Sequence, residues 1–345
     1  MLRLAVPLAA LALLWLALDM AAVGALLAST EPTLLFAALA ALACQNALSA
    51  LRWARIARRL GQPIGEARAL REYFLSQFLN MTLPAGVLGD VGRAVRMRGE
   101  AGLLRASQAV VIERMVGQVT LFSVLGAGLA LASLGGAPMV WPGWVAGVAT
   151  AAGALAGVAA AAVLAARLRG RVGRASAGFV EAVRSSVLAR EAWPGQAILS
   201  LCIVACNLGG FALCAAATGT GLSLLAIVTV VPLVLVSMVL PVSVAGWGVR
   251  EGAAAALWPL IGAASEAGVA ASIAFGLAIL VASLPGALGL LAPSQADSRS
   301  SLSLATSGTP RSVPAPGRPP AADPRDDHAA STGAKSIGRN TGSTK

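Results

Sequence analysis

The sequence predicts an all-α polytopic membrane protein with about six full spans and two broken or re-entrant segments. Of its 345 residues, 57% are hydrophobic and only 12% are charged, whereas soluble domains carry about 25% charged residues. The mean hydropathy is +0.78. Apolar runs of roughly 20 residues recur along the chain, and a helix of that length crosses about 30 Å of hydrocarbon.

Six apolar runs are long enough to be full spans: 4–28, 33–51, 108–134, 141–166, 193–217 and 266–291. The first is too long for a cleaved signal peptide and lacks a small-residue cleavage site before a soluble domain, so we expect it to be retained. Two further apolar segments, 70–88 and 222–262, are interrupted by proline, glycine and charge. Residues 1–291 are therefore predicted to form one integral membrane domain.

From residue 292 the composition changes to serine, proline, glycine and alanine with scattered charges. Such a segment cannot bury a hydrophobic core, so we expect 292–345 to be a disordered low-complexity tail.

Arginine-rich connections predict the orientation of the spans. The stretches 52–71, 93–105 and 167–190 are rich in arginine, whereas the connections near 29–32, 135–140 and 218–221 contain only Glu31 as a charged residue. Positive loops face the cytoplasm, so the three basic loops, and the net basic tail, are predicted to be cytoplasmic. The net charge of +11 then reflects topology and attraction to anionic lipid, not nucleic-acid binding.

Two of these basic loops flank segment 70–88. Because both are predicted on the same side, this segment cannot cross once and is expected to enter and return as a re-entrant hairpin.

The stretch 52–64, RWARIARRLGQPI, places Trp53, Ile56 and Leu60 at helical spacing among arginines. It predicts either an interfacial amphipathic helix or a plain basic loop.

The two broken segments share a motif. LPAGVLGDVGR at 83–93 and LPVSVAGWGVR at 240–250 both place glycine five residues and arginine nine residues after a proline. Three predicted spans lie between them, so the two motifs approach the membrane from opposite sides. That arrangement is typical of transporters with an inverted repeat. An eight-span alternative stays open, because 222–241 is long enough to cross alone.

Proline and glycine leave backbone groups unpaired at membrane depth, which is tolerated where the break lines a polar cavity. Ionisable side chains in such segments tend to mark function. Arginine can bind phosphate in bidentate fashion, and the acids would pair with the arginines or with a cationic headgroup. For each charged pair, a purely structural ion pair is the competing interpretation. The candidate site residues are Asn80, Pro84, Asp90, Arg93, Glu113, Arg114, Pro241, Arg250 and Glu251.

Several other chemistries are excluded or disfavoured. The four cysteines, Cys44, Cys202, Cys206 and Cys214, all lie in apolar runs, and the only histidine, His328, is in the tail. A zinc site or a histidine-based triad is therefore not expected. No G-x-x-x-x-G-K-[ST] string is present, so ATP-driven movement is not expected. We predict no cofactor and no metal.

Taken in order, the motifs GD..R (89–93), ER (113–114) and LP…G.G.RE (240–251) resemble the lysylphosphatidylglycerol synthase transmembrane-region family, also described as flippase-like integral membrane proteins. The resemblance covers about residues 1–291. It implies a membrane region that moves an aminoacylated lipid between leaflets, with the charged candidates as its functional set. The aminoacyl-transferase domain fused to well-known relatives has no counterpart here, so synthase activity is not implied.

The leading hypothesis is a lipid translocator, not an enzyme, that moves a polar-headed phospholipid, anionic or aminoacylated, between leaflets. The alternatives are an integral membrane enzyme or an accessory subunit that assists an envelope-biosynthesis protein in making lipids or lipid-linked glycans. Of the 26 basic residues only two are lysine, which suggests a GC-rich bacterial genome and hence the cytoplasmic membrane. The sequence leaves open the lipid, the energy coupling, the oligomeric state and the role of Asp19.

Overall fold

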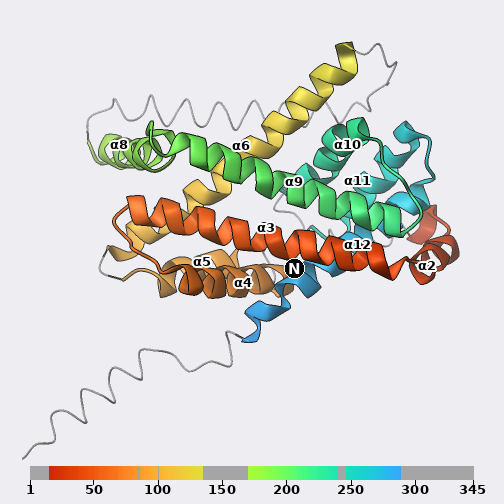
Figure 1. Cartoon of the computed structure of the whole chain (residues 1–345), viewed down its shortest axis with the longest axis horizontal. Coiled ribbons are helices and arrows are strands. Elements are labelled where there is room, and N and C mark those ends of the chain that lie inside the picture. Colours follow the sequence, from red (N-terminus) through yellow and green to blue (C-terminus); the bar gives the residue numbers. More distant parts are fainter. Residues whose placement is uncertain (1–14, 84–85, 100, 135–169, 240–245, 289–345) are drawn as a thin grey trace, which may run out of the picture. The chain divides into compact units, whose positions relative to one another are not determined.

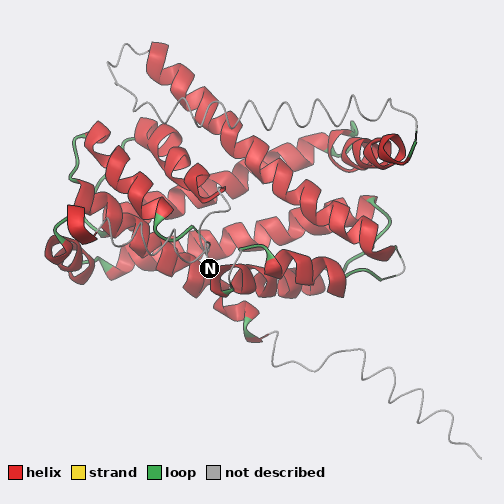
Figure 2. Ribbon diagram, turned by 180° about the vertical axis from the view of Figure 1, so that it is seen from behind, coloured by secondary structure: helices red, strands yellow, loops and turns green. Residues whose placement is uncertain are grey.

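The protein is all-helical in the computed structural model, which describes residues 15–83, 86–99, 101–134, 170–239 and 246–288 (Figure 1). No strand occurs within those ranges (Figure 2). The α-helices are α2 (Met20–Ala28), α3 (Pro32–Arg59), α4 (Glu66–Thr82), α5 (Leu88–Arg96), α6 (Gly102–Leu134), α8 (Arg171–Val183), α9 (Trp193–Ala217), α10 (Leu224–Val236), α11 (Val249–Leu257) and α12 (Ser265–Ser283). A π-helical turn covers Arg184–Leu188, and short 3-10 turns cover Ser237–Val239, Trp258–Ile261 and Leu284–Gly286.

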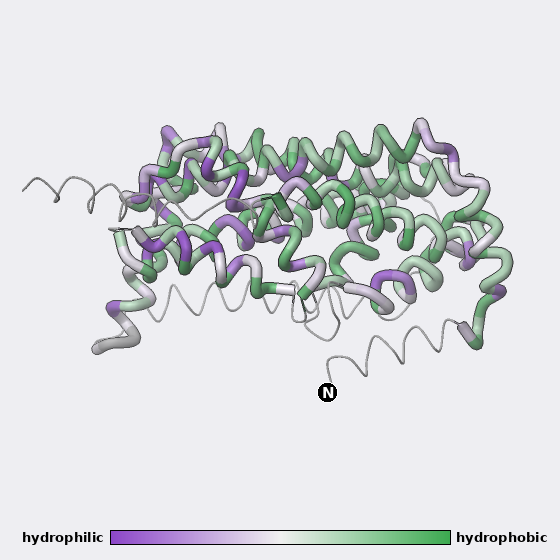
Figure 3. The backbone as a smooth tube through the Cα atoms, turned by 90° about the horizontal axis from the view of Figure 1, so that it is seen from below, coloured by the Kyte–Doolittle hydropathy of each residue, from purple (hydrophilic) through white to green (hydrophobic). Residues whose placement is uncertain are grey.

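Four of the described helical segments are long and apolar enough to cross a membrane: α3, α6, α9, and α12 with its 3-10 extension to Gly286. This confirms the predicted all-α polytopic membrane class. Hydrophobic stretches dominate the helices, and hydrophilic ones gather mainly toward the end drawn at the left (Figure 3). Figure 1 places α8 and the start of α9 at that end.

Helices α3 and α9 run antiparallel, side by side (Figure 1). At one end, the N–H of Glu31, just before α3, donates to the carbonyl of Ala217, the last residue of α9, at 3.0 Å. At the other end, arginines from the last turns of α3 line a pocket together with the start of α9. The two ends of this pair are called here the Glu31 end and the Arg59 end.

Segment 66–96 folds back on itself, as the two flanking basic loops predicted. Gln62, before α4, donates through Nε2 to the carbonyl of Met97, after α5, at 2.8 Å. Arg96 near the end of α5 donates through Nε to Glu72 Oε2 in the second turn of α4 at 2.7 Å. The chain therefore enters and leaves this hairpin at one place, close to the Arg59 end.

Helices α10 and α11, the described α-helices of segment 222–262, pack together with their outer ends at the other end of the α3–α9 pair. Helix α10 starts seven residues after Ala217, at the Glu31 end, and α11 is followed by a short 3-10 turn before α12. The start of α12 packs on α11, since a Cβ on Gly268 would lie 2.6 Å from the carbonyl oxygen of Ala254. Val269 and Ala270 of α12 share a core cluster with Val23 of α2, the helix that precedes α3.

The α4–α5 hairpin and the α10–α11 pair thus lie toward opposite ends of the α3–α9 pair, which is the arrangement that the inverted-repeat hypothesis requires. Helix α10 has 13 residues, and a helix needs about 20 to cross alone. The described geometry therefore favours a fold-back over the eight-span alternative.

The local geometry of the two motifs differs, although their sequences match. Gly89 is the second residue of α5, whereas Gly246 precedes α11 and has a φ of +84°. Arg93 is the sixth residue of α5 and Arg250 the second of α11. Proline-to-arginine spacing therefore did not predict where each helix begins. Pro84 and Pro241 lie outside the described residues.

Several predicted boundaries need correction. The run 4–28 is not one continuous helix within its described part, because the helix is interrupted at Leu18–Asp19. The Asp19 carboxylate caps α2 by accepting from the N–H of Ala21 at 2.9 Å and of Ala22 at 3.2 Å, which is the usual role of an N-cap acid. Three segments lie wholly outside the described residues: 1–14, the predicted span 141–166 and the tail 292–345.

Two predicted basic loops are helical. The span 33–51 continues as α3 to Arg59, so 52–64 is neither a separate interfacial helix nor a loop through most of its length. Residues 171–188 form α8 and the π-helical turn. The helices continue because one face of each stays buried: Trp53 and Ile56 of α3 and Ala182 of α8 belong to one hydrophobic cluster.

Candidate functional site

Helices α3, α5 and α6 bring five charged side chains into one cluster that is buried except at Arg114 and is called here the charged cluster: Arg52, Asp90, Arg93, Glu113 and Arg114. The fold-back of α4–α5 is what makes the cluster possible. It lays α5 against α4 and α6. The side chains of Asp90 and Arg93 therefore lie within reach of Glu113 and Arg114 on α6.

Glycine and asparagine hold the hairpin closed. The N–H of Gly89 donates to Asn80 Oδ1 at 2.8 Å, and Asn80 is buried on α4. A Cβ on Gly89 would overlap the carbonyl oxygen of Ser76, so only glycine permits this approach of the two helices. The predicted site residue Asn80 therefore positions α5 by holding its first turn.

Glu113 lies at the centre of the cluster and is 1% exposed. Its Oε1 accepts from Arg52 Nη2 at 2.7 Å and from the Tyr73 hydroxyl at 3.4 Å. Its Oε2 lies 3.6 Å from Arg93 Nη2. Arg52 is also fixed from α9, because its Nη1 donates to Ser200 Oγ at 3.2 Å. Glu113 is the link between the α3–α9 pair and the hairpin.

Asp90 is the second carboxylate and bridges two arginines. Its Oδ1 accepts from Arg93 Nη2 at 2.8 Å and from Ser76 Oγ at 2.9 Å. Arg114 donates to Oδ2 at 2.9 Å and to Oδ1 at 3.2 Å. The Asp90 carboxylate is thus surrounded by two guanidinium groups and one hydroxyl group.

Arg93 is fully buried between two aromatic rings. Its guanidinium carbon lies 4.5 Å from the centre of the Trp53 ring and 4.6 Å from that of Tyr73, which is cation–π distance. Its Nε and Nη1 have no hydrogen-bond partner among the described residues. Three guanidinium groups face two carboxylates in the cluster, so one positive charge is in excess. The two unpartnered nitrogens of Arg93, Nε and Nη1, together carry three N–H bonds without an acceptor in the described part of the chain.

Arg114 is the exposed edge of the cluster. Its side chain is 41% exposed, against 0% for Arg93. Beside it, α5 turns its polar face inward and an apolar face outward, with Val87, Val91 and Val95 all more than 40% exposed. The Arg114 side chain can therefore be reached from outside the protein, whereas that of Arg93 cannot.

The second predicted pair, Arg250 and Glu251, forms a separate buried ion pair, in which Arg250 Nη1 has no hydrogen-bond partner among the described residues. Arg250 Nη2 donates to Glu251 Oε1 at 2.6 Å, and Ser272 Oγ lies 2.9 Å from Arg250 Nε. Glu251 Oε2 accepts from the N–H of Gly248 at 2.6 Å and so caps α11. Both side chains are buried, their charges cancel, and no described contact joins them to the charged cluster.

A family model described as the lysylphosphatidylglycerol synthase TM region matches residues 2–286. The chain belongs to this family. It is a membrane protein of a type related to lipid or envelope metabolism. The match covers every residue of the charged cluster and both residues of the Arg250–Glu251 pair. Comparison with curated proteins and with solved structures finds no match.

Three residues of the site are not among those that the sequence predicts: Arg52, which belongs to the charged cluster, and Tyr73 and Ser76, which donate to its carboxylates. Arg52 was counted as a loop charge, yet it is 3% exposed. Buried polar residues lead up to it along one face of α3, at Asn46 and Ser49, which is a signal the sequence contains. Tyr73 and Ser76 lie with Asn80 at helical spacing on α4, a similar polar stripe.

The described residues contain no group of three or more histidine, cysteine or acidic side chains that could hold a metal ion. Each carboxylate of the charged cluster is instead bound to arginine. The arrangement offers guanidinium N–H groups, which suit an anionic oxygen ligand such as phosphate.

Proposed function

We propose that this protein moves a phosphate-bearing polar lipid between the leaflets of the bacterial cytoplasmic membrane. The observation that supports this most is the charged cluster, which keeps an excess positive charge and two unpartnered nitrogens of Arg93, Nε and Nη1, within a membrane domain. Burying ionisable groups in such a domain is costly, and they persist chiefly where they act on a substrate.

In this proposal Arg114 makes the first contact with the lipid phosphate. It is partly exposed beside the outward valine face of α5, where acyl chains can lie. A phosphate would compete with Asp90 for the Arg114 guanidinium. Asp90, once released, could pair with a cationic group on an aminoacylated headgroup. The positive charge of Arg93, which is stacked between Trp53 and Tyr73, would attract the phosphate toward the interior of the protein.

The α4–α5 hairpin and the α10–α11 pair would supply the alternating access. They lie toward opposite ends of the α3–α9 pair, and inverted elements of this kind let one half of a transporter rock against the other. The Arg250–Glu251 pair, buried and neutral, would keep α11 attached to α12 during this motion. Movement would be passive or coupled to an ion. We place the basic Arg59 end on the cytoplasmic side by the positive-inside rule.

Transport is favoured over catalysis by the state of the two carboxylates. Glu113 is bound to Arg52 and Asp90 to both Arg93 and Arg114. A general base must be free to accept a proton at working pH, whereas a carboxylate held by guanidinium groups has lost much of its basicity. We therefore propose that no bond of the lipid is made or broken.

A reconstitution experiment tests the proposal. Proteoliposomes and empty liposomes receive the same headgroup-labelled phospholipids, anionic, zwitterionic and aminoacylated, and label that changes leaflet is measured by chemical quenching. The proposal expects faster exchange of at least one phosphate-bearing lipid with the protein than without it. Equal exchange for every lipid would contradict it. Total lipid analysis of a deletion strain separates transport from chemistry, because an enzyme would leave a product missing.

A further inference from the structure

A pocket of about 410 Å³ lies outside the charged cluster, at the Arg59 end of the α3–α9 pair. This volume falls within the range of small-molecule sites. Three arginines from the last turns of α3 line it, and the residues around the start of α9 line the opposite wall: Glu191, Ala192, Gly195 and Gln196. Ala192 and Gly195 are small, and the space between the two helices is open for this reason.

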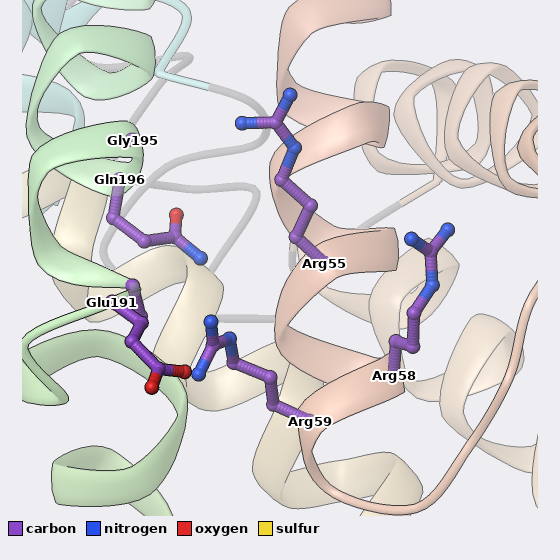
Figure 4. A pocket seen from close by; sticks show the side chains of 7 residues that line it. Arg55, Arg58, Arg59, Glu191, Gly195 and Gln196 are labelled. Carbon is purple, nitrogen blue, oxygen red and sulfur yellow. The ribbon is translucent and has the colours of Figure 1, made fainter.

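The side chains of the pocket converge from both walls (Figure 4). Arg55 and Arg59 point from α3 toward α9, while Gln196 and Glu191 point back toward α3. Arg58 also lines the pocket, but it lies on the side of α3 away from Gln196 and Glu191. Within the described residues, none of the three arginines has a hydrogen bond or an ion pair. Arg59 and Glu191 face one another without forming an ion pair. Three guanidinium groups against one carboxylate leave two positive charges in excess.

Gln196 distinguishes this pocket from an ordinary basic surface, because its amide group is buried and incompletely hydrogen-bonded. It is only 4% exposed, yet its Oε1 has no hydrogen-bond partner among the described residues. A buried polar atom without a partner costs about 1–3 kcal/mol, so a ligand or water that reaches it would be stabilising. An amide oxygen accepts a hydrogen bond, which a hydroxyl group can donate.

The pocket is also close to the charged cluster along both helices. Arg55 follows Arg52 by one turn on α3, and Gln196 precedes Ser200 by one turn on α9. Arg52 and Ser200 are themselves hydrogen-bonded. The pocket therefore occupies the next turn of the same α3–α9 interface, toward the Arg59 end.

We infer that this pocket is a second anion site, which binds a phosphate ester whose headgroup carries hydroxyl groups. Arg55 and Arg59 bind the phosphate, Arg58 adds positive charge, and Gln196 accepts from a headgroup hydroxyl. The phosphate ester is supplied either by a membrane lipid or by a soluble metabolite. The site does not require that the protein transport anything, so it stands apart from the proposed function.

Binding to the purified full-length chain in neutral detergent tests the inference. Isothermal titration with short-chain phosphatidylglycerol is compared for three proteins: the wild type, Arg55→Gln/Arg59→Gln, and the control Arg68→Gln/Arg98→Gln. The control removes the same charge from two exposed arginines outside the pocket. We expect at least tenfold weaker binding for the pocket variant and less than a twofold change for the control. Equal losses would show a diffuse basic surface and overturn the inference.

Two further arms define the ligand. Gln196→Met should weaken phosphatidylglycerol but not phosphatidylmethanol, which has the same charge and no headgroup hydroxyl; equal effects on both lipids would overturn the role of Gln196. Glycerol 3-phosphate distinguishes the sources. If it binds as tightly as the lipid, and Arg55→Gln/Arg59→Gln weakens it equally, the ligand is soluble; much weaker binding assigns the site to a lipid. Helical circular dichroism confirms that each variant is folded.

Discussion

Replacing Glu113 with glutamine should destabilise the fold more than replacing any other member of the charged cluster. Glu113 is 1% exposed, accepts from Arg52 at 2.7 Å and lies 3.6 Å from Arg93. Glutamine keeps the shape but removes the charge, so the excess positive charge of the cluster rises from one to two. Removing one partner of a buried ion pair costs about 3–5 kcal/mol, or roughly two to four orders of magnitude in the unfolding equilibrium.

The opposite replacement, Arg52→Met, should cost less. It removes the excess positive charge instead of doubling it, and Glu113 keeps Arg93 and Tyr73 as neighbours. The double variant restores the excess of one and should be more stable than Glu113→Gln alone. Reversible unfolding in mixed micelles, followed by circular dichroism, measures all three. If Arg52→Met cost more than Glu113→Gln, or if the two effects simply added, the charge argument would be refuted.

Three further predictions concern the hairpin. Gly89→Ala should destabilise the protein by more than 2 kcal/mol, because its Cβ would overlap α4; Gly92→Ala, whose Cβ meets only the movable end of an arginine side chain, should be neutral or slightly stabilising in thermal unfolding. Asp90→Asn should also destabilise the protein, because it leaves the guanidinium groups of Arg93 and Arg114 without the carboxylate that they share; wild-type thermal stability of this variant would contradict the bridging role. Arg93→Lys should lose about 2 kcal/mol by the same unfolding measurement, since lysine cannot stack its charge flat between two rings; wild-type stability would contradict the stacking role.

The fold-back of 66–96 could be predicted because two basic loops fixed both of its ends on one side. The partners of Asp90 could be predicted only in part. Arg93 is three residues away on the same helix, so helical periodicity brings the two together. Arg114 is 24 residues away and meets Asp90 only after the hairpin closes, and a single sequence contains no signal for that distance.

Arg52 shows why a charge pattern alone misleads. Arginine near a span end is most often a topology signal, and Arg55, Arg58 and Arg59 are indeed exposed. Arg52 differs because it falls on the face that Ser49 and Ile56 bury against the other helices. The boundary at residue 51 was placed by hydropathy, which falls at the first charge whether or not the helix continues. Burial of that charge follows from packing, which hydropathy does not measure.

In the proposed function, Arg114 is the residue of the charged cluster that first contacts the lipid phosphate. The most direct test compares initial rates of phospholipid exchange between leaflets in proteoliposomes containing wild type, Arg114→Gln or Arg105→Gln, an exposed arginine on the same helix. The account predicts that Arg114→Gln lowers the protein-dependent rate at least tenfold and that Arg105→Gln keeps the wild-type rate. A wild-type rate for Arg114→Gln, in a folded and correctly inserted protein, would contradict it.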